Sequence, residues 1–513
     1  MAKQTMGTGT IVAGARPEYR GLAYWMERVL KELGKVQASP DVDAVHDLRV
    51  AIRRCRSVAG VMEEVDPDPS WVEMRKLGRK LFRQLGELRD TQVLEEWTKN
   101  LSSDSDPVRL RLLATFEGRE KEMRDAALKA AAKFEQKAWR KLERALQSRA
   151  RRVPPESLAA ECLAIERLDA ARELHAAALR TEKPKPWHAL RIGVKRFRYT
   201  VESLLPARYE MWGDNLKRLQ DLLGDVHDLD VLADAIHQVA SGEPEESRTG
   251  WKERLVSERH VRIETYRQLT LGKTSLWHEW RQGLANGETL EAAAHARLRV
   301  TARAMDGNPA RTAQVARLSM RLFDSFARVH AGEVFENQDL RKVMRAASRL
   351  HGIGVVLDAA SPAKAARKFL RETRVVPGWS EMQWALLAEV VRYHRGGEPK
   401  AKHKTFARLA EKEQAAVRGL AGVLRLARVL RKCGIESTVG MRVEKSVDAL
   451  IVRVPGLEDS EQVAVRLAAG KHLLEGSLGR PLIVKSVPLA PKLVELPNTE
   501  EESERLRAAA ASD

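Results

Sequence analysis

Apolar residues recur every three or four positions along most of the chain, which is the spacing of a buried helix face. From about residue 14 to residue 284, Leu, Ala, Arg and Glu dominate, so the pattern predicts an all-helical first half. Proline, glycine and polar residues interrupt this pattern at residues 66–69, 107, 153–155, 183–186 and 241–250. The segments between these breaks have the length of helices in a bundle.

Helical periodicity continues beyond residue 290 to about residue 432, and alternating apolar residues then replace it. The segments MRVEKS, ALIVRV and PLIVKS predict three short strands, with a helix at residues 459–478 between the second and the third. Residues 436–490 are therefore expected to form a small β-β-α-β cap. Residues 491–513 carry six acids, three bases and an alanine run, a composition that predicts a disordered tail.

The first half contains an internal repeat. VHDLRVAIRRCR at residues 45–56 matches WHALRIGVKRFR at residues 187–198, an offset of 142. LGELRDTQVL at residues 85–94 matches LGDVHDLDVL at residues 223–232, an offset of 138. Because two segments recur in the same order, we predict two related helical modules, at about residues 14–150 and 151–285.

Each copy of the repeat places a histidine and three bases on one helix face. At 100° per residue, positions 46, 49, 53 and 56 fall within about 80° of one another, and so do their counterparts. For a single helix, a solvated face paired with acids on neighbouring helices is the simpler interpretation. Because such a stripe repels itself and recurs at the same register, we favour a shared anionic ligand.

The candidate binding residues are these stripes together with bases beside them and bases on the partner helix. In the first copy they are His46, Arg49, Arg53, Arg54, Arg56, Arg75, Arg79, Arg83 and Arg89. In the second copy they are His188, Arg191, Lys195, Arg196, Arg198, Lys217, Arg218 and His227. Asp90 and Asp228 follow Arg89 and His227 directly, where we expect them to orient these bases or cap a helix.

Composition supports a polyanionic partner. The 513 residues include 89 Lys plus Arg against 71 Asp plus Glu, which leaves a net charge of +18 at pH 7. The three cysteines lie far apart with no CxxC pair, so neither a zinc knuckle nor a disulfide scaffold is expected. The chain shows no signal peptide and no run of eighteen apolar residues. We expect a cytoplasmic protein that needs no cofactor and binds no membrane.

The paired segments resemble the two halves of a CHAD domain, the conserved histidine α-helical domain, over about 270 residues. This resemblance implies two four-helix bundles related by pseudo-twofold symmetry, with basic faces turned toward a groove that binds inorganic polyphosphate. Polyphosphate has about one charge per phosphate and no nucleobases, so a protein that binds it needs closely spaced cations and no groups that read base edges. The cationic stripes agree with this requirement. The resemblance also makes polyphosphate granules, polyphosphate-metabolising enzymes and a second copy of the chain candidate partners.

Residues 295–435 resemble the carboxy-terminal HD-type helical region of the exopolyphosphatase and guanosine pentaphosphate phosphohydrolase family. Where that comparison leads us to expect an HD pair, the chain reads His351 and Gly352, and Arg428 stands where an acid would help hold a metal. An early histidine of the pattern is replaced near Arg311. We therefore expect a degenerate HD-like domain without metal-assisted hydrolysis, although His351, His394 and His403 leave a three-histidine zinc site as an alternative.

Other catalytic patterns are missing from the sequence: it has no GxxxxGK[ST] loop, GxSxG elbow or HExxH helix, and no ExExK strand. The prediction is a mainly helical, non-catalytic polyphosphate-binding protein in which the HD-like domain contributes affinity, oligomerisation or partner contacts. A nucleic-acid-binding architectural protein is the first alternative, and a metal-dependent phosphohydrolase is the second.

Overall fold

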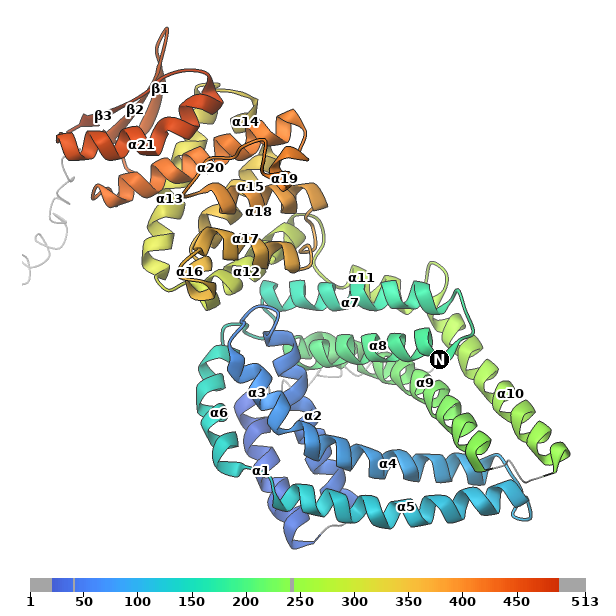
Figure 1. Ribbon diagram of the computed structural model, residues 1–513. Helices are drawn as coiled ribbons and strands as arrows, with labels where there is room; N and C mark the ends of the chain where they lie inside the picture. Colours follow the sequence, from blue (N-terminus) through green and yellow to red (C-terminus); the bar gives the residue numbers. More distant parts are fainter. Residues whose placement is uncertain (1–20, 40–41, 240–243, 489–513) are drawn as a thin grey trace, which may run out of the picture. The chain divides into compact units, whose positions relative to one another are not determined.

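The computed structural model describes residues 21–39, 42–239 and 244–488. Helices make up most of this part of the chain, and its three strands form one small sheet near the carboxy-terminal end, which confirms the predicted fold class (Figure 1). The chain divides into two compact units. Unit 1 comprises Met1–Ala304 with Val376–Gly378, and unit 2 comprises Met305–Val375 with Trp379–Asp513. The expected disordered tail lies outside the described residues, as do residues 14–20 of the expected first domain.

Unit 1 begins with the first copy of the repeat. Its helices are α1 (Leu22–Ala38), α2 (Val42–Met62), α3 (Pro69–Leu77), α4 (Arg79–Asn100), α5 (Pro107–Ala132) and α6 (Gln136–Ala150). Two of the breaks predicted from the sequence coincide with the first residues of helices, namely Pro69 of α3 and Pro107 of α5. Asp68 and Asp106 each accept hydrogen bonds from backbone amides of the first turn, at 3.0 and 2.9 Å, and a proline follows each of them.

The second copy is built from α7 (Leu158–Ala178), α8 (Pro184–Leu204), α9 (Pro206–Val239), α10 (Glu245–Thr270) and α11 (Leu276–Gln282). One long helix, α9, occupies the sequence positions that α3 and α4 share in the first copy. There the helix is interrupted at Gly78, which ends α3 and begins α4. The two copies therefore keep their repeated segments on helices while differing in how those helices are joined.

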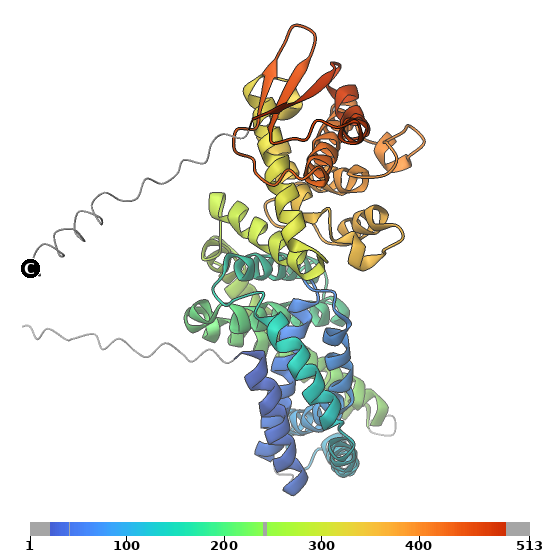
Figure 2. The same cartoon turned by 90° about the vertical axis from the view of Figure 1, so that its left-hand side faces the viewer.

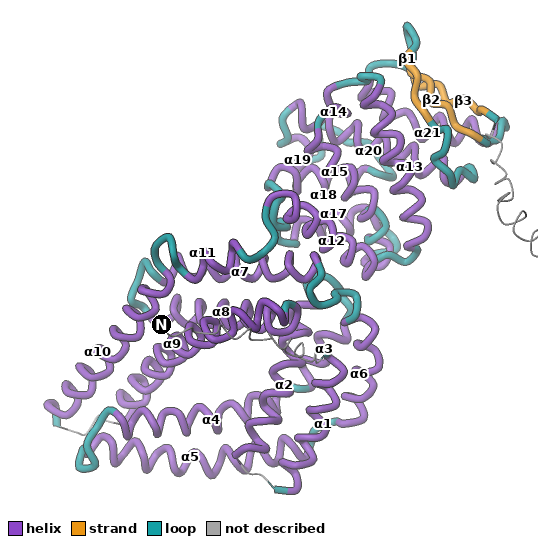
Figure 3. Tube along the Cα trace, turned by 180° about the vertical axis from the view of Figure 1, so that it is seen from behind, coloured by secondary structure: helices purple, strands orange, loops and turns teal. Residues whose placement is uncertain are grey.

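The two copies meet where α2 packs against α8 and α4 against α9. Figures 1 and 3, from opposite sides, show these four helices around the middle of unit 1. Equivalent residues of the repeat supply the core on both sides. The fully buried side chains are Leu48, Ile52 and Cys55 in α2 and Leu190, Val194 and Phe197 in α8. Burial of this face fixes the rotation of each helix and leaves the cationic stripe on a less buried side.

Helix α12 (Gly287–Met305) extends unit 1 beyond the repeat. Arg297 on this helix is 3% exposed, and its Nε donates to Glu166 of α7 at 3.0 Å. The same guanidinium donates to the hydroxyl of Thr301 and to the carbonyl of Glu64. Since a buried arginine is stable only when its charge and its donors are matched, these contacts anchor α12 to both copies of the repeat.

In the part of unit 2 that the structure describes, eight helices precede a small α/β segment. The helices are α13 (Pro309–Arg328), α14 (Glu333–Glu336), α15 (Gln338–Leu350), α16 (Gly354–Leu357), α17 (Pro362–Glu372), α18 (Glu381–Tyr393), α19 (Lys404–Ala407) and α20 (Glu411–Lys432). The final segment is β1 (Arg442–Lys445), β2 (Leu450–Pro455), α21 (Glu461–Leu478) and β3 (Leu482–Val487). This order matches the β-β-α-β cap predicted from the sequence.

The sheet has the order β1-β2-β3, with β1 antiparallel and β3 parallel to β2, and Figure 2 shows α21 beside it. Two glycines allow α20 and α21 to approach closely. A Cβ added at Gly422 would lie 2.8 Å from Leu474, and one at Gly470 would lie 2.7 Å from Val429. Among the helices of the described residues, none has the length and apolar character that a bilayer-spanning segment needs.

Candidate anion-binding surface

The cationic stripes of the two copies lie on neighbouring helices, because α2 packs against α8. The guanidinium of Arg53 stacks over the ring of Tyr199 at 5.2 Å, so a base of the first copy contacts an aromatic side chain of the second. Lys195 of α8 is repelled by the nearby charges of Arg49 and Arg53 of α2. The structure thus brings both stripes into one electrostatic environment.

A cavity of about 810 Å³ lies between these two helices. Both copies of the repeat contribute to its lining, the second through α7 as well as α8. Six basic side chains line it, namely Arg53, Arg56, Arg75, Arg167, Lys195 and Arg196, against the two acids Glu63 and Glu64. Phe82 and Tyr199 add aromatic surface. This excess of cations over acids favours an anionic occupant.

The lowered pKa of Lys195 reflects its burial and the excess of positive charge around it. Burial and the neighbouring charges of Arg191 and Arg49 lower the pKa of Lys195 to about 8, and Asp228 only partly opposes them. Arg53 and Arg191 each keep a buried Nε without an acceptor in the described part of the chain. Since buried charged donors are normally paired, this surface is suited to an external anion with several acceptor oxygens.

The first copy adds a smaller cavity of about 390 Å³ beside α2, α4 and α5. His46, Arg49, Arg89 and Arg124 line it, together with Leu85, Leu88 and other apolar side chains. Burial is the main cause that lowers the pKa of Arg49, and Asp90, 3.7 Å away, opposes it. Asp90 therefore lies beside Arg49 of α2, a base other than the Arg89 that we expected it to orient.

In the second copy, the corresponding place holds a pair of histidines. The Nδ1 atoms of His188 and His227 lie 3.2 Å apart, and one of them donates to the other. Burial, then Arg191 and His188, lower the pKa of His227 to about 4. Burial and Arg191 also lower the pKa of His188. Burial raises the pKa of Asp228 to about 6. Both rings are thus neutral at pH 7 next to several cations.

Several predicted binding residues have partners within unit 1. Arg54 forms an ion pair with Glu202 of α8 and stacks on Trp25 at 5.1 Å. The remaining contacts are Arg56 to the carbonyl of Arg75 at 2.8 Å, Arg75 to Glu63, and Arg198 to the hydroxyl of Tyr209 at 3.1 Å. These contacts join neighbouring helices, so the residues involved also support the fold.

The other predicted residues lie at the exposed margin. The exposed side chains are His46, Arg79, Arg83, Arg89, Arg196, Lys217 and Arg218. Arg83 lies 3.6 Å from Glu87, and Lys217 lies 3.3 Å from Asp221, each one helical turn away. Exposed pairs of this kind contribute little and leave the bases free to exchange partners. The predicted set therefore has a central group around Arg53 and Lys195 and a peripheral group around it.

Sequence reasoning did not identify Arg167, Tyr199 or Arg124. Tyr199 directly follows the repeated segment, but its counterpart in the first copy is Ser57, so the repeat gave no signal. Arg167 lies on α7, where its Nη2 pairs with Glu64 at 2.6 Å and donates to the carbonyl of Gly60. Only the packing of α7 against the repeat brings this residue to the cavity.

In unit 2, the three histidines that suggested a zinc site do not gather. The rings of His351 and His394 have centroids 5.3 Å apart, whereas His403 receives a hydrogen bond from Tyr393 at 2.8 Å and stacks on its ring. Across the described ranges, no group of three or more His, Cys, Asp or Glu side chains is arranged to hold a metal ion. The packing therefore separates the alternative zinc ligands.

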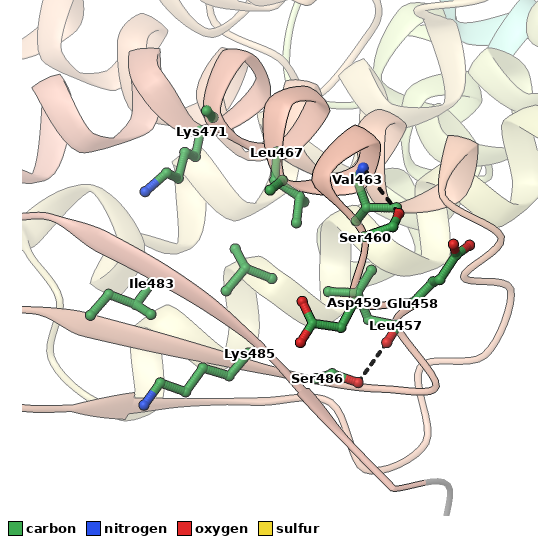
Figure 4. A pocket seen from close by; sticks show the side chains of 13 residues that line it. Leu457, Glu458, Asp459, Ser460, Val463, Leu467, Lys471, Ile483, Lys485 and Ser486 are labelled. Atoms are coloured by element: carbon green, nitrogen blue, oxygen red, sulfur yellow. Dashed lines mark hydrogen bonds between the residues drawn. The ribbon is translucent and has the colours of Figure 1, made fainter.

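The cap of unit 2 contains a further cavity, of about 570 Å³, between α21 and β3. Figure 4 shows Leu467 of α21 and Ile483 of β3 on facing sides of it, with Asp459 nearby. Of its two lysines, Lys471 is already paired with Glu475 at 2.9 Å and donates to the carbonyl of Leu482. Its two lysines are matched by two acids, Glu458 and Asp459, so the cavity lacks the excess of cations that the α2 and α8 surface has.

Comparison with protein families gives two matches. The model of the CHAD domain matches residues 20–237, and the model of Ppx/GppA phosphatase, domain III, matches residues 300–455. Comparison with curated proteins gives no match. Among the solved structures that match is the crystal structure of the CHAD domain from the plant Ricinus communis. It is 22% identical, with a TM-score of 0.39, and the match covers 48% of this chain and 88% of that chain.

Proposed function

Because the chain contains a CHAD domain at residues 20–237, joined to a region similar to domain III of Ppx/GppA phosphatase, we propose that it binds inorganic polyphosphate without hydrolysing it. CHAD domains are linked with polyphosphate. The binding surface is the pair of basic faces on α2 and α8, and the protein acts at polyphosphate granules in the cytoplasm.

The cavity between α2 and α8 is the observation that carries this proposal. Its six basic side chains come from both copies of the repeat, and its two acids leave them incompletely neutralised. Polyphosphate presents about one charge per phosphate along a thin, flexible chain, so neighbouring phosphates can meet Arg53, Lys195 and Arg196 in turn. Arginine forks grip adjacent non-bridging oxygens, and no base-reading groups are required.

The non-catalytic part of the proposal rests on unit 2. Metal-assisted phosphate hydrolysis needs carboxylates or histidines that converge on an ion, and the sequence has Gly352 and Arg428 where acids were expected. The experiment that tests it is phosphate release from long-chain polyphosphate, with and without a chelator. Release that the chelator abolishes would replace this proposal by a phosphohydrolase.

The binding test uses labelled long-chain polyphosphate near physiological salt, with excess duplex DNA as competitor. The test variant is Arg53→Glu with Lys195→Glu, which reverses one central charge in each copy. Lys137→Glu with Lys141→Glu is a matched control, because it changes the net charge equally on the exposed side of α6. We expect binding that resists DNA, that the test variant lowers at least tenfold, and that the control retains.

Two outcomes would overturn the proposal. Displacement by duplex DNA at equal charge concentration would favour a nucleic-acid-binding protein. Equal loss in both variants would mean that net charge, and not the α2 and α8 surface, holds the polymer. A steep salt dependence would not distinguish polyphosphate binding from DNA binding, since both polymers release counterions when bound.

A further inference from the structure

Two buried histidines lie where α13, α15, α18 and α20 pack together in unit 2. His351 and His394 directly follow the last residues of α15 and α18, and they are 8% and 1% exposed. Their ring centroids are 5.3 Å apart, with the rings nearly perpendicular. This pair is the centre of a cluster that the α2 and α8 surface of unit 1 does not include.

Cations surround this pair. Arg428 of α20 donates from Nη1 to the backbone carbonyl of His394 at 3.1 Å. Charges of Arg311 and Arg428 act on His351, and those of Arg395 and Arg428 act on His394. Lys432, one helical turn after Arg428, is repelled by the same three arginines and by Arg466. The cluster therefore combines charges from the first turn of α13, the end of α18 and the last turns of α20.

Acids do not balance these charges. Asp306 is the carboxylate that faces His351, and its Oδ1 is already the acceptor for the backbone amide of Asn308. Throughout the described ranges, no carboxylate forms an ion pair with Arg311, Arg395, Arg428 or Lys432. A neighbouring arginine, Arg425, is different, because it donates to the carbonyls of Tyr393, Gly396 and Gly397.

Burial and the uncompensated positive charge of this cluster lower the pKa of Arg428. Burial, together with Arg395 and Arg311, lowers the pKa of Arg428 to about 10. An arginine rarely departs this far from its usual range, since its charge is normally paired when buried. A bound anion would compensate the four cations together, which makes the cluster a site with a missing counter-charge.

The histidines add acceptors to these donors. The Nδ1 of His351 donates to the carbonyl of Ser348 at 2.8 Å, and the Nδ1 of His394 donates to the carbonyl of Val391 at 2.6 Å. Burial and the surrounding cations keep both rings neutral by lowering the pKa of each. In a neutral ring whose Nδ1 carries the proton, Nε2 has a lone pair and can only accept.

We propose that this cluster of unit 2 binds a phosphoryl group that carries a proton, as in hydrogen phosphate, the monoanion of a phosphate monoester or the protonated end group of a phosphate chain. The anionic oxygens meet Arg311, Arg395 and Arg428, and the P–OH group donates to a histidine Nε2. Sulfate has the same shape and charge but no proton at neutral pH. A site with a buried acceptor discriminates against a ligand that lacks the matching donor. This inference does not depend on the function proposed for unit 1.

The test is calorimetric titration of the full chain at pH 7 and constant ionic strength. Inorganic phosphate, glycerol phosphate and tripolyphosphate distinguish the free ion, a monoester and a chain end, and sulfate is the ligand without a proton. The cluster variant is Arg311→Gln with Arg428→Gln. The matched control is Arg317→Gln with Lys412→Gln, which removes two exposed charges from the same two helices.

We expect at least one phosphoryl ligand to bind at least tenfold more tightly than sulfate. The cluster variant should lower that affinity at least tenfold, whereas the control should retain it. The unit 1 variant Arg53→Glu with Lys195→Glu should also retain it, even if polyphosphate binding is lost. Equal binding of sulfate and phosphate, or undiminished binding by the cluster variant, would overturn the inference. If only the unit 1 variant lost affinity for the phosphoryl ligand, the phosphate site would lie in unit 1, and the inference would also be overturned.

The same variants provide a second measurement that does not need a ligand. If the cluster lacks its counter-charge, the cluster variant should unfold at a higher temperature than the native chain in phosphate-free buffer, because repulsion is removed. Phosphate should then stabilise the native chain and leave the variant unchanged. A variant that is less stable without phosphate would show that the arginines are structural, which contradicts the proposal.

Discussion

The imidazole rings of His188 and His227 lie in contact, with their centroids 4.4 Å apart and their Nδ1 atoms 3.2 Å apart. These residues come from α8 and α9, and the charges that face them are Arg191, Lys195 and Asp230. A proton added to the pair would repel Arg191 and Lys195 unless an anion is present. We therefore expect the pair to couple proton uptake to anion binding.

Polyphosphate binding should become tighter as the pH falls from 7.5 to 5.5. The free rings have lowered pKa values, and a bound polyanion raises them, so binding takes up protons and acid favours it. One proton taken up corresponds to about tenfold in affinity per pH unit at most. His188→Gln with His227→Gln should reduce the slope, and Asp228, whose pKa is about 6, should account for the part that remains.

Titration of labelled polyphosphate at several pH values measures this slope. His260→Gln on the exposed side of α10 serves as the control and should keep the native slope. A histidine double variant with the native slope would contradict a role for the pair.

At alkaline pH, Lys195 should control the affinity. With a pKa of about 8 in the free protein, it loses its charge between pH 7 and pH 9, and a bound polyanion restores the pKa toward its usual value. Affinity should therefore fall as the pH rises through 8, by up to about tenfold per pH unit. Lys195→Arg should remove this dependence while keeping tight binding, because arginine stays charged. A Lys195→Arg variant that retains the alkaline loss would assign it to another group.

Arg54 should matter more for stability than for binding. It pairs with Glu202, whose side chain is 7% exposed, and thereby joins α2 to α8. Removing one partner leaves a buried charge without compensation, so Arg54→Ala should destabilise unit 1 by about 3 kcal/mol. Urea unfolding followed by circular dichroism measures this loss. Polyphosphate affinity of the folded variant should change less than threefold, and a larger loss at full stability would make Arg54 a ligand contact.

The crossing of α20 and α21 allows a matched test of packing. Gly470→Ala places a methyl group 2.7 Å from Val429 and should cost unit 2 about 1–3 kcal/mol. Gly476→Ala on the same helix meets nothing within 4 Å and should stabilise it by about 0.5–1 kcal/mol. Thermal unfolding of the two variants should therefore shift in opposite directions. Shifts of the same sign would show that the helices do not approach at Gly470.

The repeat predicted that α2 and α8 carry equivalent buried faces and equivalent cationic stripes, because matching residues recur at matching registers. Arg54 shows where this reasoning stops. Its position next to Arg53 turns it about 100° around the helix, away from the stripe. That rotation follows from helix geometry alone. Its pairing with Glu202 depends on how two distant segments pack, and no local pattern contains that information.

The same limit applies to the residues that sequence reasoning missed or separated. Arg167 reaches the cavity through the packing of α7, a helix outside the repeated segments. The sequence suggested His351, His394 and His403 as one set, but the structure brings only the first two together. Short-range periodicity predicted the order of helices and strands, whereas the composition of each site depends on contacts between residues far apart in the chain.

A linear ligand that lies across α2 and α8 meets the same series of side chains from either end, because the two stripes are copies. Polyphosphate also reads identically in both directions, so reversing a bound chain leaves its contacts nearly unchanged. The two copies differ at one position beside the stripes, where Arg89 of the first copy corresponds to His227 of the second. Protonation of His227 would give it a positive charge like that of Arg89. At acid pH the two copies would therefore present more nearly the same charges to a bound polymer.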